Sequence, residues 1–205
     1  ENLLEENIRK KGGSFYTPRS IVNHMCEDSL AHYICNKLNN ELNIQQISNF
    51  VSNKEFDINK NDFVKVNATQ IDFILEDIKI CDPAIGSGAF AVGIVNLISR
   101  LRVSLKYFVD RKYKNTSYYF KRDCIQNSIY GVDIDASAVE ITKLRLWLSL
   151  ISEEEDYSST EPLPNLDYKI MQGDSLIDEF FGYKFDIDEN KNNQLTLVMQ
   201  IVNFF

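Results

Sequence analysis

The fold of this chain is decided by the stretch IKICDPAIGSGAF at residues 78–90. Its first four residues are mostly apolar and predict a short strand, which ends at Asp82. A turn with two glycines, Gly86 and Gly88, follows. The next residues are apolar at helical spacing and predict a long helix from about Ala89 to Phe108. In open α/β sheets, a turn at the carboxyl end of a strand is where ligands bind.

The same alternation continues toward the C-terminus. We predict a second strand over Ser128–Val132, a helix over about Ala136–Leu150, and a third strand over Asp167–Met171. Strand, helix, strand, helix and strand in this order predict an α/β chain with a parallel, doubly wound sheet. Right-handed crossovers would bring the carboxyl ends of all three strands to one edge of that sheet.

The residues before this alternation predict a helical segment. Thr17 and Pro18 are typical of a helix start, with Thr17 as the N-cap and Pro18 as the first helical residue. Residues 38–66 are polar and predict an irregular, partly helical insertion, and Ala68–Glu76 predicts another helix. We therefore expect two parts, a helical segment with the Thr-Pro pair and a partial Rossmann-like domain, at residues 1–78 and 79–205.

Composition excludes several classes of protein. With 205 residues, 44% of them hydrophobic and 25% charged, the chain is globular and not disordered. It has no apolar run long enough to span a membrane, so we expect no membrane association. Its four cysteines form no CxxC pair and its two histidines are eight residues apart, which predicts no metal site and fits reduced thiols in the cytoplasm. The oligomeric state stays open on the sequence.

The net charge of -8 argues at first against a nucleic-acid partner. The acidic residues are concentrated, however: residues 151–189 carry 12 Asp and Glu against two Lys, a balance of -10, which leaves +2 for the rest of the chain. The chain begins at Glu1 and not at Met, and it ends inside the apolar run 195–205. We therefore expect it to be a piece of a longer polypeptide.

Each of the three predicted strands ends in a carboxylate: Asp82, Asp133 and Asp174. Asp82 directly before the glycine turn disfavours a phosphate there and favours a ligand with an ammonium or hydroxyl group. Asp133 stands where this architecture commonly binds a ribose diol. Asp174 can accept from the amino group of a purine, although a Gly-Asp turn needs no ligand. An amino acid joined to an adenosine, as in S-adenosyl-L-methionine, would satisfy all three.

Four segments in order give the chain a recognisable likeness. Together they resemble the adenine-N6 DNA methyltransferases of restriction–modification systems, and most of all the Eco57I-like enzymes in which restriction and methylation are fused. The segments are GSFYTPRS (13–20), ICDPAIGSGAF (80–90), IYGVDIDASAVEITKLRLWLSL (129–150) and YKIMQGDSLID (168–178). The likeness implies the N-terminal half of the methyltransferase domain, with a Rossmann-like S-adenosylmethionine-dependent fold. It also implies double-stranded DNA as the partner of the full-length protein.

The likeness also implies a set of cofactor-binding residues. Thr17 would contact the methionine carboxylate, and Ile134 would pack on the adenine ring. Asp133 would hold the ribose hydroxyls, and Asp174 would accept from the adenine amino group. The methionine side would be lined by Asp82, Ala84 and Gly86, with Gly88 allowing the close turn. Ile85 stands where the family often has a cysteine, a change that we expect to be harmless.

One family motif is missing. The catalytic Asn/Asp-Pro-Pro-aromatic tetrapeptide does not occur, since the 205 residues contain no Pro-Pro pair. In the family this motif holds the flipped adenine for methyl transfer, and such positioning supplies much of the rate. We therefore name no catalytic residue here and expect the chain to be inactive alone.

Two other functions stay open on the sequence. Residues 86–91 also fit the GxGxxA pattern of an NAD(P)-dependent oxidoreductase, with Asp110 at the spacing of the expected acidic residue. The chain could also be a non-catalytic cofactor-binding or specificity module. Separately, residues 111–122 interleave basic and aromatic side chains, a pattern that fits a nucleic-acid face or, as we favour, a solvated hairpin or helix end.

Overall fold

A parallel sheet of three strands organises the chain. The computed structural model describes residues 17–39, 43–109, 116–153, 162, 164–176, 179–180 and 183–184. In the sheet, β2 (Ile129–Asp133) lies between β1 (Ile80–Asp82) and β3 (Ile170–Gln172). The predicted parallel α/β arrangement is confirmed, and it is consistent with a partial Rossmann-like fold. The first strand ends at Asp82 as predicted, and β2 and β3 each end one residue later than predicted.

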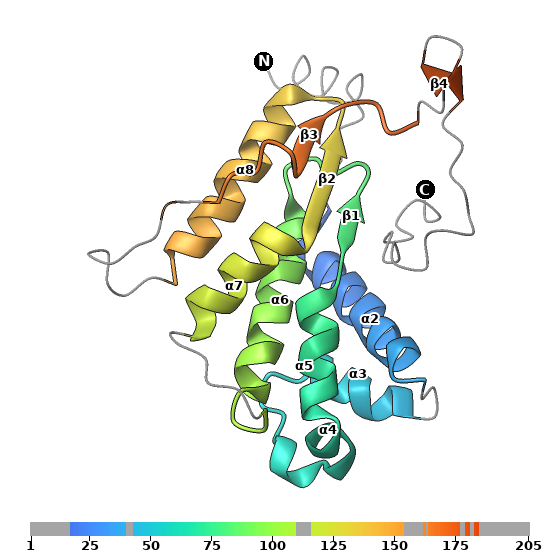
Figure 1. Ribbon diagram of the computed structural model, residues 1–205, viewed down its shortest axis with the longest axis vertical. Helices are drawn as coiled ribbons and strands as arrows, with labels where there is room; N and C mark the ends of the chain where they lie inside the picture. The colour runs from blue at the N-terminus through green and yellow to red at the C-terminus, as the bar shows by residue number, and fades with distance from the viewer. Residues whose placement is uncertain are drawn as a thin grey trace.

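Helices connect the strands and pack beside them (Figure 1). The connection from β1 to β2 contains α6 (Ala89–Leu105) and α7 (Thr116–Asn127), and α8 (Ala136–Ile151) connects β2 to β3. The first connection thus holds two helices, which explains its length. A separate antiparallel pair follows β3 and consists of β4 (Glu179–Phe180) and β5 (Tyr183–Lys184).

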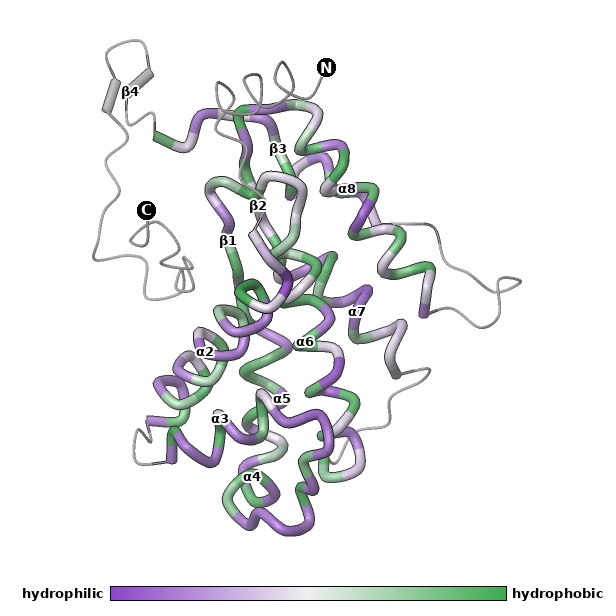
Figure 2. Tube along the Cα trace, turned by 180° about the vertical axis from the view of Figure 1, so that it is seen from behind, coloured by the Kyte–Doolittle hydropathy of each residue, from purple (hydrophilic) through white to green (hydrophobic). Residues whose placement is uncertain are grey.

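The N-terminal part is helical, as predicted. Two longer helices pack against α6: α2 (Arg19–Lys37) and α5 (Ala68–Asp77). Between them the chain forms three short elements in the stretch predicted to be irregular and partly helical: α3 (Ile44–Ser52), the 3-10 turn η2 (Ile58–Lys60) and α4 (Asp62–Val66). Figure 2 shows hydrophilic residues gathered in the loops around α4, at the end of the molecule farthest from the sheet.

The start of α2 differs from the prediction. Pro18, and not Thr17, is the N-cap residue, and no side chain caps the helix. The carbonyl of Pro18 accepts from the backbone N–H groups of Ile21 and Val22 at 3.0 and 3.1 Å. Thr17 therefore lies one residue outside the helix, where its hydroxyl makes no capping hydrogen bond.

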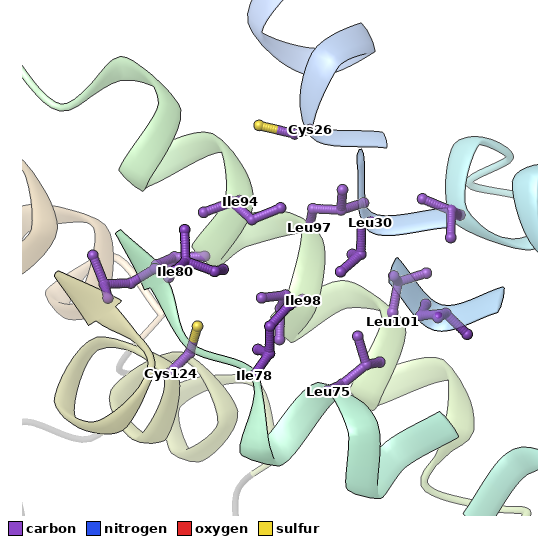
Figure 3. Close-up of a cluster of buried hydrophobic side chains, with 14 of the residues drawn as sticks. Cys26, Leu30, Leu75, Ile78, Ile80, Ile94, Leu97, Ile98, Leu101 and Cys124 are labelled. Atoms are coloured by element: carbon purple, nitrogen blue, oxygen red, sulfur yellow. The ribbon is translucent and has the colours of Figure 1, made fainter. Parts of the chain in front are cut away.

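One apolar cluster fills the space between the helices and the sheet (Figure 3). It combines side chains from α2, α5, β1 and α6, including Leu30, Leu75, Ile80, Ile94 and Ile98, all of which are buried. The cluster crosses the predicted boundary at residue 78, although the division into two domains itself stays a prediction. Three of the four cysteines, Cys26, Cys35 and Cys124, are small buried residues, as expected.

A buried arginine links three helices inside this core. Arg102 of α6 is 1% exposed, and its Nε donates to Asp72 of α5 at 2.9 Å, while its Nη1 donates to Asp123 of α7 at 2.8 Å. Its Nη2 also lies 3.2 Å from Glu76. The guanidinium stacks 4.5 Å from the ring centroid of Phe120. Such a buried charge is tolerated because three carboxylates surround the guanidinium.

The basic and aromatic residues were predicted to be a solvated hairpin or helix end, or a nucleic-acid face, and those that the structure describes lie in a helix. Residues 116–122 belong to α7, and Tyr118, Phe120 and Lys121 are buried. Lys121 Nζ donates to the carbonyl of Ser149 and to Glu153 Oε1, at 3.1 and 2.7 Å. Both interpretations are wrong for these three side chains, since they pack inside the protein. Residues 110–115 lie outside the described residues.

Helix α8 also corrects an expectation. The apolar run at 144–150 predicts core positions for its leucines; Leu146 and Leu150 are buried, but Leu144 and Leu148 are 52% and 55% exposed. In the described part of the chain no helix is both long and apolar enough to cross a membrane.

Candidate functional site

The loops at the carboxyl ends of β1 and β2 are held together by one carboxylate. Asp133 Oδ2 accepts from the backbone N–H of Gly86 at 2.7 Å, although the two residues are 47 positions apart. Asp133 Oδ1 accepts from the N–H of Asp135 at 3.0 Å. The end of β2 is thus connected directly to the glycine turn after β1. The predicted meeting of these strand ends at one edge of the sheet is what the structure shows.

Asp82 lies at the same edge and is 6% exposed. Its Oδ1 accepts from the N–H of Ala84 at 3.1 Å, which closes a tight turn at the end of β1. Burial raises the pKa of Asp82 above its ordinary value; the hydrogen bond from Ala84 opposes this, and the nearby charge of Asp133 adds to it. A buried carboxylate beside a second one would be stabilised by a cation at this edge.

The glycine turn requires glycine at two positions. Gly86 and Gly88 have φ angles of 53° and 75°, in the left-handed region that side chains disfavour. A Cβ on Gly88 would also lie 2.7 Å from Thr142 Cγ2, whereas a Cβ on Gly86 would meet nothing within 4 Å. Gly86 therefore leaves open space at the turn, and Gly88 is the N-cap of α6 with no side-chain cap hydrogen bond.

Two residues of α8 support this turn. Thr142 Oγ1 donates to the carbonyl of Gly86 at 2.8 Å. Arg145 Nη1 donates to the carbonyl of Ser87 at 2.6 Å and lies 3.2 Å from the hydroxyl of Ser87. Sequence reasoning missed both residues, because each is more than 50 positions from the turn and neither belongs to a local pattern.

The turn also packs against β2 through Ile85 and Gly131. The N–H of Ile85 donates to the carbonyl of Val132 at 3.0 Å. A Cβ on Gly131 would lie 2.2 Å from Ile85 Cδ1, so the isoleucine occupies the space that the glycine leaves. Ile85 is therefore a buried packing residue matched to Gly131, which explains how the turn accommodates it.

The third strand end lies beside the second. The N–H of Gly173 donates to the carbonyl of Asp133 at 2.9 Å, and Gln172 Nε2 donates to the carbonyl of Ile134 at 3.1 Å. Ile134 itself is 68% exposed. Asp174 is exposed, and its Oδ1 accepts from the N–H of Leu176 at 3.0 Å. One carboxylate oxygen of Asp174 thus accepts a hydrogen bond within its own turn.

Thr17 approaches the same region from the N-terminal side. It lines a groove of about 520 Å³ together with Ala89, the first residue of α6. The structure therefore brings the Thr-Pro segment next to the helix that follows the glycine turn. Between the described residues, no group of three or more His, Cys, Asp or Glu side chains is arranged to hold a metal ion.

Taken together, the described residues define an α/β protein whose parallel strands end at one edge, and in open α/β sheets ligands bind at this edge. Residues 127–201 match the model of a family described as Eco57I restriction-modification methylase. The chain is also 31% identical, over 198 residues, to a protein of Methanocaldococcus jannaschii described as a candidate type II restriction enzyme and methyltransferase, RM.MjaORFECS2P.

These matches confirm the likeness to the Eco57I-like restriction–modification methylases that was seen in the motifs. The match to the archaeal relative covers 92% of this chain but only 16% of the relative. The chain thus spans about a sixth of the length of that curated relative.

Proposed function

We propose that this chain is the S-adenosylmethionine-binding part of a DNA adenine-N6 methyltransferase of a restriction–modification system. The observation that carries the proposal is the contact between Gly86 and Asp133, which joins the two loops that such a cofactor would bridge. The proposal assigns the methionine end of the cofactor to the turn after β1 and the adenosine end to the loops after β2 and β3.

The residues at the methionine end fit a group that carries both signs of charge. The buried carboxylate of Asp82 suits an ammonium group, which would offset the penalty of its burial. Helix α6 begins at Ala89, and its N-cap Gly88 has no side chain to cap it, so the N–H groups of its first turn suit a carboxylate. Thr17 lies near this helix start and offers a hydroxyl donor.

The residues at the adenosine end fit a ribose and a purine. A carboxylate can accept about four hydrogen bonds. Asp133 uses two of them on the N–H groups of Gly86 and Asp135, and the others are available to a diol. The exposed side chain of Ile134 offers an apolar surface for a ring, and Asp174 offers an acceptor for an amino group.

The bound cofactor would supply an electrophilic methyl group. This chain's own residues would bind and orient it, and the residues that hold the adenine of DNA would come from the missing tetrapeptide. We therefore expect that the 205-residue chain alone transfers no methyl group to duplex DNA. It would need the remainder of a longer protein to do so.

The nicotinamide alternative has less support. The pyrophosphate of a bound NAD(P) would lie at the glycine turn, where the buried carboxylate of Asp82 would repel it. Its expected acidic residue, Asp110, lies outside the described residues. The family match also favours a methylase. A non-catalytic module in a longer protein shares the same cofactor residues, so an assay of the full-length protein for methylation separates it from an enzyme.

Isothermal titration calorimetry tests the proposal directly. We expect the chain to bind S-adenosylmethionine with a Kd well below ~1 mM. We expect no detectable binding of NAD. The matched variants are Asp133→Asn, which removes a proposed ribose acceptor, and Asp135→Asn. Asp135 belongs to the same loop but only caps α8, through the N–H of Ser137 at 2.8 Å, and asparagine is an equally good cap. No heat of binding at millimolar cofactor would refute the proposal.

A further inference from the structure

The groove that includes Thr17 carries a charge that the proposed cofactor does not explain. Four cations line it: Arg19 of α2, Lys54 after α3, Arg100 of α6 and Arg145 of α8. A single carboxylate, Glu27, lines it with them. In a chain with a net charge of -8, such a concentration of positive charge in one groove is a local departure from the overall composition.

None of the four cations forms a close ion pair with a described carboxylate, although the charge of Glu27 acts on Arg100 and raises its pKa against the effect of burial. Among the ion pairs between described residues, none includes any of the four. The pairs elsewhere in the molecule use other cations, including Arg102, Lys121 and Lys143. The groove therefore presents positive charge to an anion from outside the described residues.

Two of the four are held in place by the backbone. Arg145 Nη1 donates to Ser87, in the middle of the glycine turn, and Arg100 Nη2 donates to the carbonyl of Val51. Each guanidinium has five N–H donors and keeps several after these bonds. Arg19 and Lys54 are exposed. Neutral polar side chains, Asn23 and Asn96, also line the groove, together with apolar residues such as Val92 and Leu97.

We propose that this groove binds the phosphate groups of a DNA backbone. A guanidinium presents paired donors that match phosphate oxygens, and a lysine adds a point charge. The cations come from four separate segments, which suits an extended polyanion that runs across them. The identification of the polyanion as DNA rests on the proposed function, whereas the preference for phosphate rests on the groove alone.

The groove lies next to the turn that we propose for the cofactor. Arg145 contacts Ser87, which lies between the two glycines of the proposed cofactor turn. Backbone contacts orient a protein on DNA without reading its sequence. A phosphate bound here would hold the duplex at a constant position relative to the cofactor, whichever residues elsewhere recognise the bases.

Fluorescence anisotropy with a labelled duplex of about 30 base pairs tests the proposal, with salt varied from roughly 50 to 200 mM. The variant Arg19→Gln/Lys54→Gln removes two exposed charges from the groove. The matched variant Lys60→Gln/Lys65→Gln removes two exposed charges outside it. We expect the groove variant to bind about tenfold or more weakly and its salt dependence to fall by about two in slope, roughly 0.9 for each phosphate that is no longer neutralised. The matched variant should stay within about twofold of wild type.

Equal effects of the two variants, or no effect of either, would overturn the proposal. Displacement of the duplex by inorganic phosphate at matched ionic strength would overturn it too, in favour of a site for a small anion. Calorimetry with S-adenosylmethionine on the same variants separates this proposal from the proposed function. If the groove variant loses affinity for DNA but still binds the cofactor, the proposed role of the groove is supported. If the chain binds DNA through the groove but binds no cofactor, only the proposed function is refuted.

Discussion

Asp133 at the end of β2 accepts the backbone N–H of Gly86 at 2.7 Å, so one side chain fixes the turn that follows a different strand. Its other oxygen accepts from Asp135 at 3.0 Å. This makes Asp133 a structural residue before any ligand binds. A ligand that also hydrogen-bonds to Asp133 would bind to two loops whose relative position is already fixed.

Asp133→Asn should therefore reduce stability as well as cofactor affinity. Asparagine keeps only one acceptor oxygen, so its NH₂ group would face the N–H of Gly86 or of Asp135. We expect a loss of roughly 1–3 kcal/mol in the free energy of unfolding, measured by urea denaturation. Asp135→Asn should change it by less than about 0.5 kcal/mol, because asparagine is a good N-cap. Equal stability of Asp133→Asn and wild type would show that the contact with Gly86 does not hold the turn.

Asp82→Asn should raise the stability of the fold and lower the affinity for S-adenosylmethionine. The folded protein raises the pKa of Asp82 mainly through burial, so its charged form is disfavoured in the fold. The stability associated with its protonated form is complete below the ordinary pKa of 3.8 and is lost as the pH rises through the raised value. Asparagine carries no charge and can still accept from Ala84. We therefore expect a higher Tm for the variant at about pH 7, with the difference vanishing near pH ~3.

The same substitution should weaken binding of S-adenosylmethionine. A hydrogen bond to a charged group contributes roughly 1.5–3 kcal/mol, which is about 10- to 150-fold in Kd. Asp77→Asn, at an exposed position just before β1, is the control for both measurements. A lower Tm of Asp82→Asn at neutral pH would contradict the burial argument, and unchanged affinity would contradict the assignment of Asp82 to the methionine end.

The two glycines of the turn should differ in how well they tolerate alanine. Both have positive φ, so alanine costs about 1–2 kcal/mol at either position. At Gly88 the new methyl group would also collide with Thr142, which it would not do at Gly86. Urea denaturation should therefore show a larger loss for Gly88→Ala than for Gly86→Ala.

Thr142→Ala supplies the control for this comparison. Alone it removes the hydrogen bond to the carbonyl of Gly86, at a cost of about 0.5–1.5 kcal/mol. Combined with Gly88→Ala it also removes the colliding atoms, so the double variant should lose less than the sum of the two single losses. Strict additivity would mean that the collision is relieved in another way.

Sequence patterns predicted the three strands and their carboxylates because each strand is a short apolar run that ends at a polar turn. They predicted the glycine turn for the same reason. They could not predict the support from Thr142 and Arg145, since this depends on how α8 packs beside the turn, 56 and 58 positions away in the chain. The pairing of Ile85 with Gly131 is of the same kind.

The errors have a common physical cause. Local pattern suggested a capping role for Thr17, a solvent-exposed segment at 111–122 and a buried position for Leu144 and Leu148. In each case tertiary packing decides the outcome: α7 turns Phe120 and Lys121 toward the core, and α8 leaves two leucines outside. Residues with mixed apolar and charged atoms, such as Lys121, are buried when a neighbour supplies their partners, and only the folded structure shows those partners.

Arg102 offers a stability prediction that does not depend on function. Removing it would leave Asp72, which is also 1% exposed, as a buried carboxylate without its guanidinium, whereas Asp123 and Glu76 are more accessible to water. Arg102→Met should therefore cost roughly 3–5 kcal/mol in unfolding free energy.

The double variant Asp72→Leu/Arg102→Met removes the stranded charge and should lose clearly less than Arg102→Met alone, because an apolar pair often replaces a buried ion pair without a large penalty. The exposed Arg19→Met is the control and should change stability by less than about 0.5 kcal/mol. If the double variant is as unstable as Arg102→Met, the stacking of the guanidinium on Phe120 and its contact with Asp123 carry the stability, and the burial of Asp72 without Arg102 does not reduce it.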